Sequence, residues 1–271
     1  MIRNVLSIAG SDPSGGAGIQ ADLKAFSARG VYGMAALTAL TAQNTQGVTG
    51  IHPVPAEFVA AQIETIFADV RVDAVKIGMI ADAGIAEAVA DALAPYKGLP
   101  LVLDPVMVAK GGARLLAPEA IEMLIGRLFP LATLLTPNLP EAAALLGETI
   151  ADDRTSMAMQ ASRLRALGPQ AVLVKGGHLD GPESPDVLFG PDGPAWFEGR
   201  RIDTPNTHGT GCTLSSALAA ELAKGATPED AVAAAKHYLA GAVAAAGDLA
   251  VGTGHGPVQH FHQLWARRTT I

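Results

Sequence analysis

The feature that most constrains the fold of this chain is a repeated alternation between short apolar runs and longer amphipathic stretches. The apolar runs lie at residues 5–9, 34–42, 75–77, 101–103 and 134–136, and the amphipathic stretches at residues 17–28, 56–70, 83–93 and 118–128. Strands that alternate with helices of about 10 to 15 residues form right-handed βαβ units. The pattern therefore predicts an α/β fold with a mostly parallel sheet covered by helices on both faces.

The C-terminal half departs from this alternation in two places. Residues 185–199 hold two short runs around the turn sequence Gly-Pro-Asp-Gly, which predicts an antiparallel hairpin at the edge of the sheet. The alanine-rich stretches 209–224 and 226–246 then predict two closely packed helices. Because no linker, repeat or low-complexity tract interrupts the chain, we expect residues 1–271 to form a single domain.

Composition excludes several classes of protein. Apolar residues make up 49% of the chain and aromatic residues only 4%, which favours an aliphatic α/β core over a β-sandwich. The net charge of −7 and the lack of a long basic run argue against nucleic-acid and membrane partners. A single cysteine cannot form an internal disulfide, and neither a signal peptide nor a long apolar span is recognisable. We expect a soluble cytoplasmic protein that holds any anionic ligand locally.

Polar residues follow many of the predicted strands. These residues are Asp12, Gln43, Asn44, Lys76, Asp104, Thr136, Asn138, Glu141, Lys175 and His178. In an open parallel sheet, ligands bind outside the carboxyl ends of the strands. The sequence therefore predicts a ligand site along one rim of the sheet, to which these residues contribute.

The run from Asn206 to Thr213 places Gly209, Gly211 and the lone Cys212 where a helix is about to begin. Glycine lets the backbone approach a bound group, and the free N–H groups of a first helical turn attract anions. This segment is therefore predicted to be an anion cradle that could receive a phosphate, with a titratable thiol in its first turn.

A second glycine-rich loop follows the first predicted strand. Gly16, Gly18 and Ala21 formally satisfy the dinucleotide fingerprint, but residues 23–56 contain no acidic residue to hold a ribose. Two other readings stay open. The glycines either let a small ligand approach the backbone, with Asp22 as a hydrogen-bond acceptor, or form a purely structural turn.

Each polar candidate also has an ordinary structural reading. Asn138 and Glu141 suit Mg²⁺ but equally suit an N-cap with its capping-box partner. Asp104 either orients a phosphate or metal-bound water, or initiates a turn. Lys175 either reaches a phosphoryl group or is solvated, and Gln43 either binds a heterocycle edge or is exposed.

Three further features bear on the pocket and on assembly. Met79 and Val106 are core residues by type and form a pocket wall only if the rim is a site. The glycines of residues 109–114 permit a lid, although an ordinary loop fits as well. Apolar stretches such as residues 56–70 leave room for an interface, and we expect a homodimer.

Seven segments in this order resemble the hydroxymethylpyrimidine/phosphomethylpyrimidine kinase family, the ThiD-type enzymes of thiamine biosynthesis in the ribokinase-like superfamily. The segments are GSDPSGGAGIQADLK from Gly10, TAQNT from Thr41, KIGM from Lys76, LDPVM from Leu103, TPNLPEA from Thr136, KGGH from Lys175 and NTHGTGCTLS from Asn206. The resemblance implies a ribokinase-like three-layer αβα sandwich with a mostly parallel central sheet and a small antiparallel edge hairpin. It also implies ATP and Mg²⁺ as cofactors.

The resemblance further implies a bifunctional kinase. Such an enzyme phosphorylates 4-amino-5-hydroxymethyl-2-methylpyrimidine and then phosphorylates the monophosphate to the diphosphate. The roles implied are substrate binding by Gln43, Asp22, Ala17, Met79 and Val106; ATP binding by Asp104, Asn138, Lys175 and Thr210; Mg²⁺ binding by Glu141 and Asp104, partly through water; and catalysis by Cys212, Lys175, Gly209 and Gly211.

The role of Cys212 remains open at the sequence level. The resemblance casts it as the group that faces the substrate hydroxyl. A helix N-terminus lowers the pKa of a thiol, but neighbouring phosphates raise it again. Because phosphoryl transfer has a loose transition state, we expect Cys212 to accept or relay the proton late and to shape the pocket.

Three other functions compete with this assignment. A pyridoxal/pyridoxine kinase would phosphorylate a similar hydroxymethyl heterocycle on a related fold. A nicotinamide dehydrogenase would use the N-terminal glycine loop, but the sequence after this loop lacks the acidic residue that would bind the ribose. A non-catalytic pyrimidine-binding protein would have little use for Asp104, Asn138, Glu141 and Lys175 together.

Overall fold

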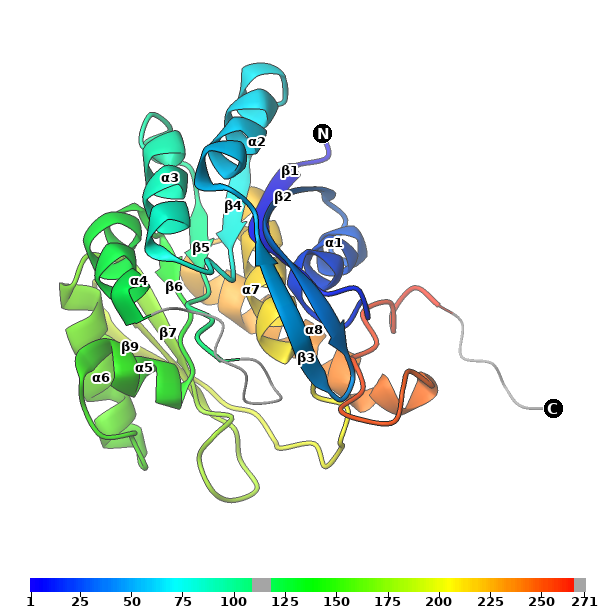
Figure 1. Cartoon of the computed structure of the whole chain (residues 1–271). Coiled ribbons are helices and arrows are strands. Elements are labelled where there is room, and N and C mark those ends of the chain that lie inside the picture. The colour runs from blue at the N-terminus through cyan, green and yellow to red at the C-terminus, as the bar shows by residue number, and fades with distance from the viewer. Residues whose placement is uncertain (109–117, 266–271) are drawn as a thin grey trace.

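A computed structural model describes residues 1–108 and 118–265, and its centre is a single sheet between two layers of helices (Figure 1). Within these residues the sheet has nine strands in the order β3-β2-β1-β4-β5-β6-β7-β8-β9. The strands are β1 (Asn4–Ser11), β2 (Tyr32–Asn44), β3 (Gly47–Pro53), β4 (Ala74–Ile77), β5 (Leu101–Leu103), β6 (Leu134–Leu135), β7 (Ala171–Lys175), β8 (Asp186–Gly190) and β9 (Gly193–Phe197). The predicted alternation of strands and helices is confirmed.

Six strands, from β2 to β7 in the sheet order, pair in parallel, and the two edges are antiparallel. The predicted hairpin in residues 185–199 is confirmed as β8 and β9. A second edge hairpin, in which β3 pairs with β2, was not predicted. Its strand β3 is largely exposed and has two glycines in seven residues, so no apolar run marks it.

Eight α-helices lie in the described part of the chain. They are α1 (Gly18–Ala28), α2 (Ala56–Asp69), α3 (Ala83–Leu93), α4 (Pro118–Met123), α5 (Leu139–Leu146), α6 (Arg154–Ala166), α7 (Thr210–Ala223) and α8 (Pro228–Ala244). The predicted helix 118–128 continues beyond α4 as a π-helical turn, Leu124–Leu128. Helices α2 to α6 cover one face of the sheet, and α1, α7 and α8 cover the other (Figure 1).

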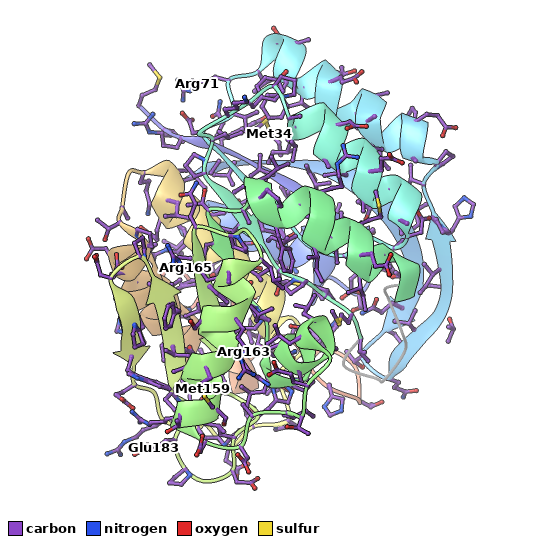
Figure 2. The ribbon with its side chains drawn as sticks, turned by 90° about the vertical axis from the view of Figure 1, so that its left-hand side faces the viewer. Met34, Arg71, Met159, Arg163, Arg165 and Glu183 are labelled. Carbon is purple, nitrogen blue, oxygen red and sulfur yellow. The ribbon has the colours of Figure 1, made fainter. Side chains whose placement is uncertain are left out.

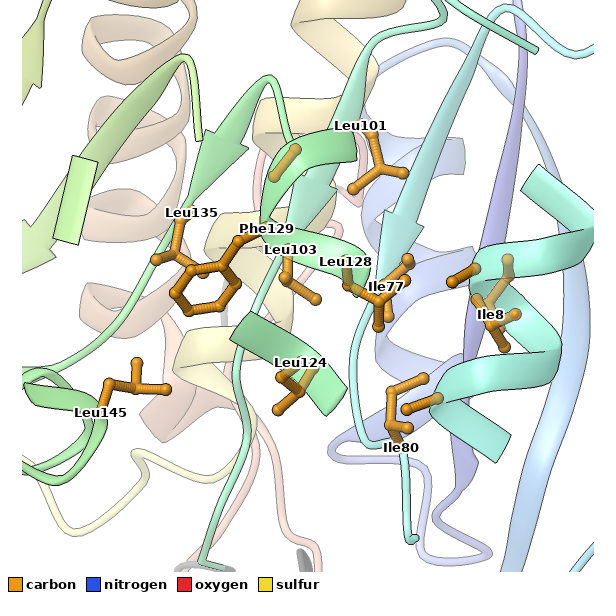
Figure 3. Close-up of a cluster of buried hydrophobic side chains, with 14 of the residues drawn as sticks. Ile8, Ile77, Ile80, Leu101, Leu103, Leu124, Leu128, Phe129, Leu135 and Leu145 are labelled. Atoms are coloured by element: carbon orange, nitrogen blue, oxygen red, sulfur yellow. The ribbon is translucent and has the colours of Figure 1, made fainter. Parts of the chain in front are cut away.

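The larger core lies between the sheet and helices α2 to α6. Figure 3 shows Leu124, Leu128 and Phe129 packed over Leu103 of β5 and Leu135 of β6. All five side chains are at most 2% exposed. Since burying one such side chain contributes about 1.5–3 kcal/mol, this aliphatic layer is a major source of stability.

The outer helices are amphipathic, as α6 illustrates. Met157, Ala161 and Leu164 recur at helical spacing and are buried against the sheet. Met159 and Arg163 lie on the opposite side of the helix and face outward (Figure 2).

The path of the chain creates a crevice at the carboxyl end of β1. From β1 the chain crosses to β2 on one side, whereas β4 and the later parallel strands are added on the other side. The loops that follow β1 and β4 therefore diverge, and such a switch point is where open α/β sheets bind ligands.

Two sequence expectations bear on other parts of the molecule. Residues 109–114, which were considered as a lid, lie outside the described residues. Across the helices of residues 1–108 and 118–265, none combines the length and apolar character needed to cross a bilayer.

Candidate active site

A cavity of about 570 Å³ opens at the carboxyl ends of the strands. It is lined by twelve of the thirteen predicted site residues, namely Ala17, Gln43, Met79, Asp104, Val106, Asn138, Glu141, Lys175, Gly209, Thr210, Gly211 and Cys212. These residues come from segments spread over most of the chain. The parallel sheet brings them together because its strand ends share one rim.

An ion pair between Lys175 and Asp104 forms one wall of the cavity. Lys175 ends β7, and its Nζ lies 3.0 Å from Oδ1 of Asp104, which is only 1% exposed. Thr136 and Ser215 also donate hydroxyl hydrogen bonds to this carboxylate. Burial opposes ionisation of Asp104, but Lys175 and Lys76 outweigh it and hold its pKa below the usual value. Asp104 is therefore a buried carboxylate anion.

Asn138 and Glu141 form a capping box at the start of α5. The Asn138 side chain accepts from the Glu141 N–H, and the Glu141 carboxylate accepts from the Asn138 N–H, both at 2.8 Å. The structural reading of this pair is thus correct, and both residues also line the cavity. Burial, partly offset by Lys175, raises the pKa of Glu141 to about 7.

The predicted anion cradle lies at the first turn of α7. Gly209 precedes the helix with φ of 77°, and a Cβ there would come within 1.8 Å of the Gly16 carbonyl oxygen. Only glycine satisfies both constraints. A Cβ on Gly211 would lie 3.6 Å from Nζ of Lys175, so the helix start faces the ion pair. The N–H groups of this turn and Lys175 thus concentrate positive potential in one corner of the cavity.

Cys212 is half-buried in the same turn. Burial raises the pKa of its thiol to about 11, although the ammonium of Lys76 acts in the opposite direction. A hydrogen bond from the Gly18 N–H also favours the thiolate without reversing the shift. The side chain is therefore a neutral thiol at neutral pH.

The structure places Asp22 beneath the cavity rather than in its lining. This residue was expected to surround the substrate, but it is fully buried and does not line the cavity. Both of its carboxylate oxygens lie 2.9 Å from Nζ of the fully buried Lys76, and Ser7 and Ser216 donate hydroxyl hydrogen bonds to it. Asp22 therefore ties α1 to β1, β4 and α7 beneath the cavity.

An Asp12–His208 pair in the cavity wall was not recognised from the sequence. Nε2 of His208 lies 2.8 Å from Oδ2 of Asp12, and both side chains are buried. Asp12 was noted only as a polar residue after a strand, and His208 only as part of the glycine-rich run. The residues stand 196 positions apart, so no local pattern links them.

The donor set of the cavity bears on metal binding. Nowhere in residues 1–108 and 118–265 do three or more His, Cys, Asp or Glu side chains form a cluster suited to a metal ion. Asp104 and Glu141 nevertheless supply two carboxylates to one cavity. Mg²⁺ commonly takes one or two carboxylates together with phosphate oxygens and water. The residues therefore fit a Mg²⁺ ion that binds together with a nucleotide.

Comparison with known proteins places the chain in a family. The sequence model described as phosphomethylpyrimidine kinase matches residues 12–259. The hydroxymethylpyrimidine/phosphomethylpyrimidine kinase of Escherichia coli strain K12 is 54% identical over 262 residues, covering 97% of this chain and 98% of that protein.

Solved structures that resemble the fold include those of two kinases. An ADP complex of Bacillus subtilis pyridoxal kinase has a TM-score of 0.89 and 40% identity, covering 97% of this chain and 99% of that one. Phosphomethylpyrimidine kinase from Clostridium difficile has a TM-score of 0.77 and 44% identity, covering 88% of this chain and 97% of that one. The predicted ribokinase-like three-layer fold is confirmed, and the chain belongs to the phosphomethylpyrimidine kinase family.

Proposed function

We propose that the protein is a bifunctional ATP-dependent kinase of thiamine biosynthesis. It phosphorylates 4-amino-5-hydroxymethyl-2-methylpyrimidine to the monophosphate and then to the diphosphate. The observation that carries this proposal is the position of the α7 N-terminus, whose Gly211 faces both Lys175 and Asp104 in the cavity. Family membership and the full-length relatives support the same activity.

The phosphate end of the cavity stabilises charge. The N–H groups at Gly209, Gly211 and Cys212 receive the oxygens of the transferred phosphoryl group, and Lys175 neutralises the charge on it. Thr210 and Asn138 contact the ATP phosphates. The ion pair with Asp104 holds the Lys175 ammonium at the cavity wall at 3.0 Å, so no reorganisation is needed when charge develops.

Asp104 and Glu141 would hold Mg²⁺, partly through water. When bound, the ion neutralises phosphate charge and orients the transferred group. Because the pKa of Glu141 is about 7, this carboxylate is readily available as an anion at pH 8 and becomes protonated below neutrality.

The substrate end of the cavity binds the heterocycle. Ala17, Met79 and Val106 supply apolar walls, and the Gln43 carboxamide supplies a donor and an acceptor to the ring edge. Cys212 lies where the two ends meet and faces the substrate hydroxyl. As a neutral thiol it shapes the pocket and relays the proton late in the transfer.

The second candidate is a pyridoxal/pyridoxine kinase. One observation favours it, namely the close structural likeness to the Bacillus subtilis pyridoxal kinase. The two functions differ in the second step, because only hydroxymethylpyrimidine monophosphate is phosphorylated again.

The proposed kinase acts as a homodimer in the cytoplasm. We propose a homodimer in which α2 and the β2–β3 edge meet a second copy, since Phe58, Leu40 and Ile51 are between 38% and 59% exposed there. Light scattering after size exclusion tests this state. We place the reaction in the cytoplasm, where ATP and reduced thiols coexist.

Mass spectrometry of the products tests the function directly. Purified protein is incubated with ATP, Mg²⁺ and either hydroxymethylpyrimidine or pyridoxal. We expect mono- and diphosphate products from the pyrimidine and at most slow formation of one product from pyridoxal. A product that stops at the monophosphate contradicts the two-step activity, and turnover of pyridoxal alone establishes the second candidate.

A further inference from the structure

The Asp12–His208 pair touches the end of Gln43. Nε2 of His208 lies 2.8 Å from Oδ2 of Asp12 and 3.4 Å from the Gln43 amide nitrogen. On its other side, the Gln43 carboxamide oxygen lies 3.1 Å from Oγ1 of Thr41. Gln43 is therefore held between two polar side chains at the cavity wall, and the protons of these neighbours decide which way its carboxamide faces.

Nε2 of His208 donates its proton to the Asp12 carboxylate. The Asp12 carboxylate already accepts N–H hydrogen bonds from Ser14, Gly16 and Ala17. Burial raises its pKa, but the hydrogen bond from His208 and those of its own loop prevail and lower the pKa of Asp12 to about 2. An ionised carboxylate can only accept, so Nε2 of His208 must donate to it.

The proton on Thr41 is also committed. Its hydroxyl donates to the Ser11 carbonyl oxygen at 2.8 Å, and a hydroxyl has only one proton. Thr41 therefore presents a lone pair to Gln43. The protonated Nε2 of His208 has no lone pair to offer, and it can only share with Gln43 the proton that it donates to Asp12. The carboxamide is complementary to both neighbours when it turns its oxygen toward His208 and its nitrogen toward Thr41. In the opposite orientation its N–H would face the N–H of His208 and its oxygen would face the lone pair of Thr41; the oxygen and nitrogen of an amide are assigned from such contacts.

We propose that Asp12 and His208 are positioning residues that lock the Gln43 carboxamide in this orientation and thereby set substrate selectivity. The remaining lone pair and the remaining N–H of Gln43 then face the cavity in a fixed order. They match a ring nitrogen next to an exocyclic amine, which is the edge of a 4-aminopyrimidine. Pyridoxal lacks this edge, since its hydroxyl-bearing carbon is not bonded to the ring nitrogen. The inference rests on the proposed kinase function.

The test compares selectivity for the two heterocycles. Steady-state kinetics with hydroxymethylpyrimidine and with pyridoxal are measured for the wild type, His208→Leu, His208→Gln and the exposed control His255→Leu. We expect His208→Leu to raise KM for the pyrimidine about tenfold, the loss of about one hydrogen bond, with kcat and the KM for ATP nearly unchanged. His208→Gln should restore much of the affinity, because its amide nitrogen can donate to Asp12.

A double variant separates positioning from general damage. In a Gln43→Ala background, His208→Leu should add nothing to the KM, since the group that it orients is gone. If thermal denaturation shows that His208→Leu does not fold, Thr41→Val is used in its place. The valine removes the hydroxyl contact on the other side of Gln43. We expect the same loss of selectivity.

The outcomes that overturn the inference differ from those that overturn the proposed function. Equal losses for both heterocycles, or additive effects with Gln43→Ala, show that His208 is merely structural and refute the positioning role alone. A wild-type enzyme that does not phosphorylate hydroxymethylpyrimidine contradicts the kinase function itself, and the inference falls with it.

Discussion

Lys175 and Asp104 lie 71 positions apart in the chain, yet Nζ of the lysine is 3.0 Å from Oδ1 of the aspartate at the cavity wall. The pair meets because β5 and β7 end at the same rim, on either side of β6. Asp104 also has hydroxyl donors in Thr136 and Ser215, so its position does not depend on Lys175 alone. The ammonium can therefore engage a phosphate without releasing Asp104 from its place.

Replacement of Lys175 should act on catalysis more than on substrate binding. We expect Lys175→Met to lower kcat by about 10²–10³-fold, since it removes a preorganised charge that meets the transferred group. The KM for the pyrimidine should change little, and steady-state kinetics measure both constants. Lys175→Arg, which keeps the charge, serves as the control. A loss below about tenfold for the methionine variant would refute the role.

The raised pKa of Cys212 predicts that its thiolate is not required. A pKa of about 11 leaves roughly one thiol in 10⁴ ionised at pH 7. If the thiolate were the base, kcat would rise about tenfold per pH unit between pH 6 and 9. We expect a nearly flat profile in this range, and rates within about tenfold of the wild type for Cys212→Ser and Cys212→Ala in both steps. A steep profile that the serine variant abolishes would restore the base role.

The buried pair of Asp22 and Lys76 should contribute to stability. Removing one partner leaves an uncompensated buried charge, so Asp22→Asn or Lys76→Met should each cost about 3–5 kcal/mol of unfolding free energy, measured by urea denaturation. The double variant should recover part of this loss. Arg163→Met, which breaks the exposed pair with Glu148, is the matched control and should cost less than about 1 kcal/mol.

The same variants test whether Asp22 contacts the substrate. Because its carboxylate does not line the cavity, the folded Asp22→Asn protein should keep its KM for hydroxymethylpyrimidine within about threefold. A KM that rises tenfold or more in the folded variant would show that Asp22 binds the substrate. A tenfold rise corresponds to about 1.4 kcal/mol of lost binding free energy.

Glu141 should make stability depend on pH near neutrality. The folded protein raises the pKa of Glu141 from 4.5 to about 7, so the native state binds more protons than the unfolded chain between these values. The contribution of Glu141 to the free energy of unfolding therefore falls as pH rises through this window. Glu141→Gln removes this contribution, yet its side-chain oxygen can still accept from the Asn138 N–H.

Urea denaturation at several pH values measures the effect. The stability of Glu141→Gln relative to the wild type should increase from pH 4.5 to 7 and level off above it. Glu57→Gln, at an exposed position, should show no such trend. A difference between Glu141→Gln and the wild type that is constant with pH would contradict the raised pKa.

Metal removal should abolish activity without loosening the ligand-free fold. A chelator should stop both phosphorylation steps, and added Mg²⁺ should restore them, since the ion is expected to arrive with ATP. The unfolding temperature of the ligand-free protein should not change, because its described residues hold no preformed metal cluster. A chelator-induced drop in that temperature would indicate a resident structural metal instead.

The sequence by itself determined the architecture and the rim on which the site lies. The alternation of strands and helices, the hairpin at 185–199 and the polar residues after strands are local patterns, and local patterns set secondary structure and its direction. Gly209 and Gly211, at the start of α7, marked the predicted anion cradle for the same reason. Strand β3 was not predicted, because an exposed edge strand needs no apolar run.

Only the tertiary structure decided which side chains meet. Asp22 has the residue type of a substrate ligand, but the fold buries it against Lys76 beneath the cavity. Asp12 and His208 lie far apart in the sequence and become a hydrogen-bonded pair next to Gln43. Contacts between distant segments depend on how strands are ordered and helices packed, and no spacing along the chain encodes them. The same long-range packing sets the burial that shifts the pKa values of Glu141 and Cys212.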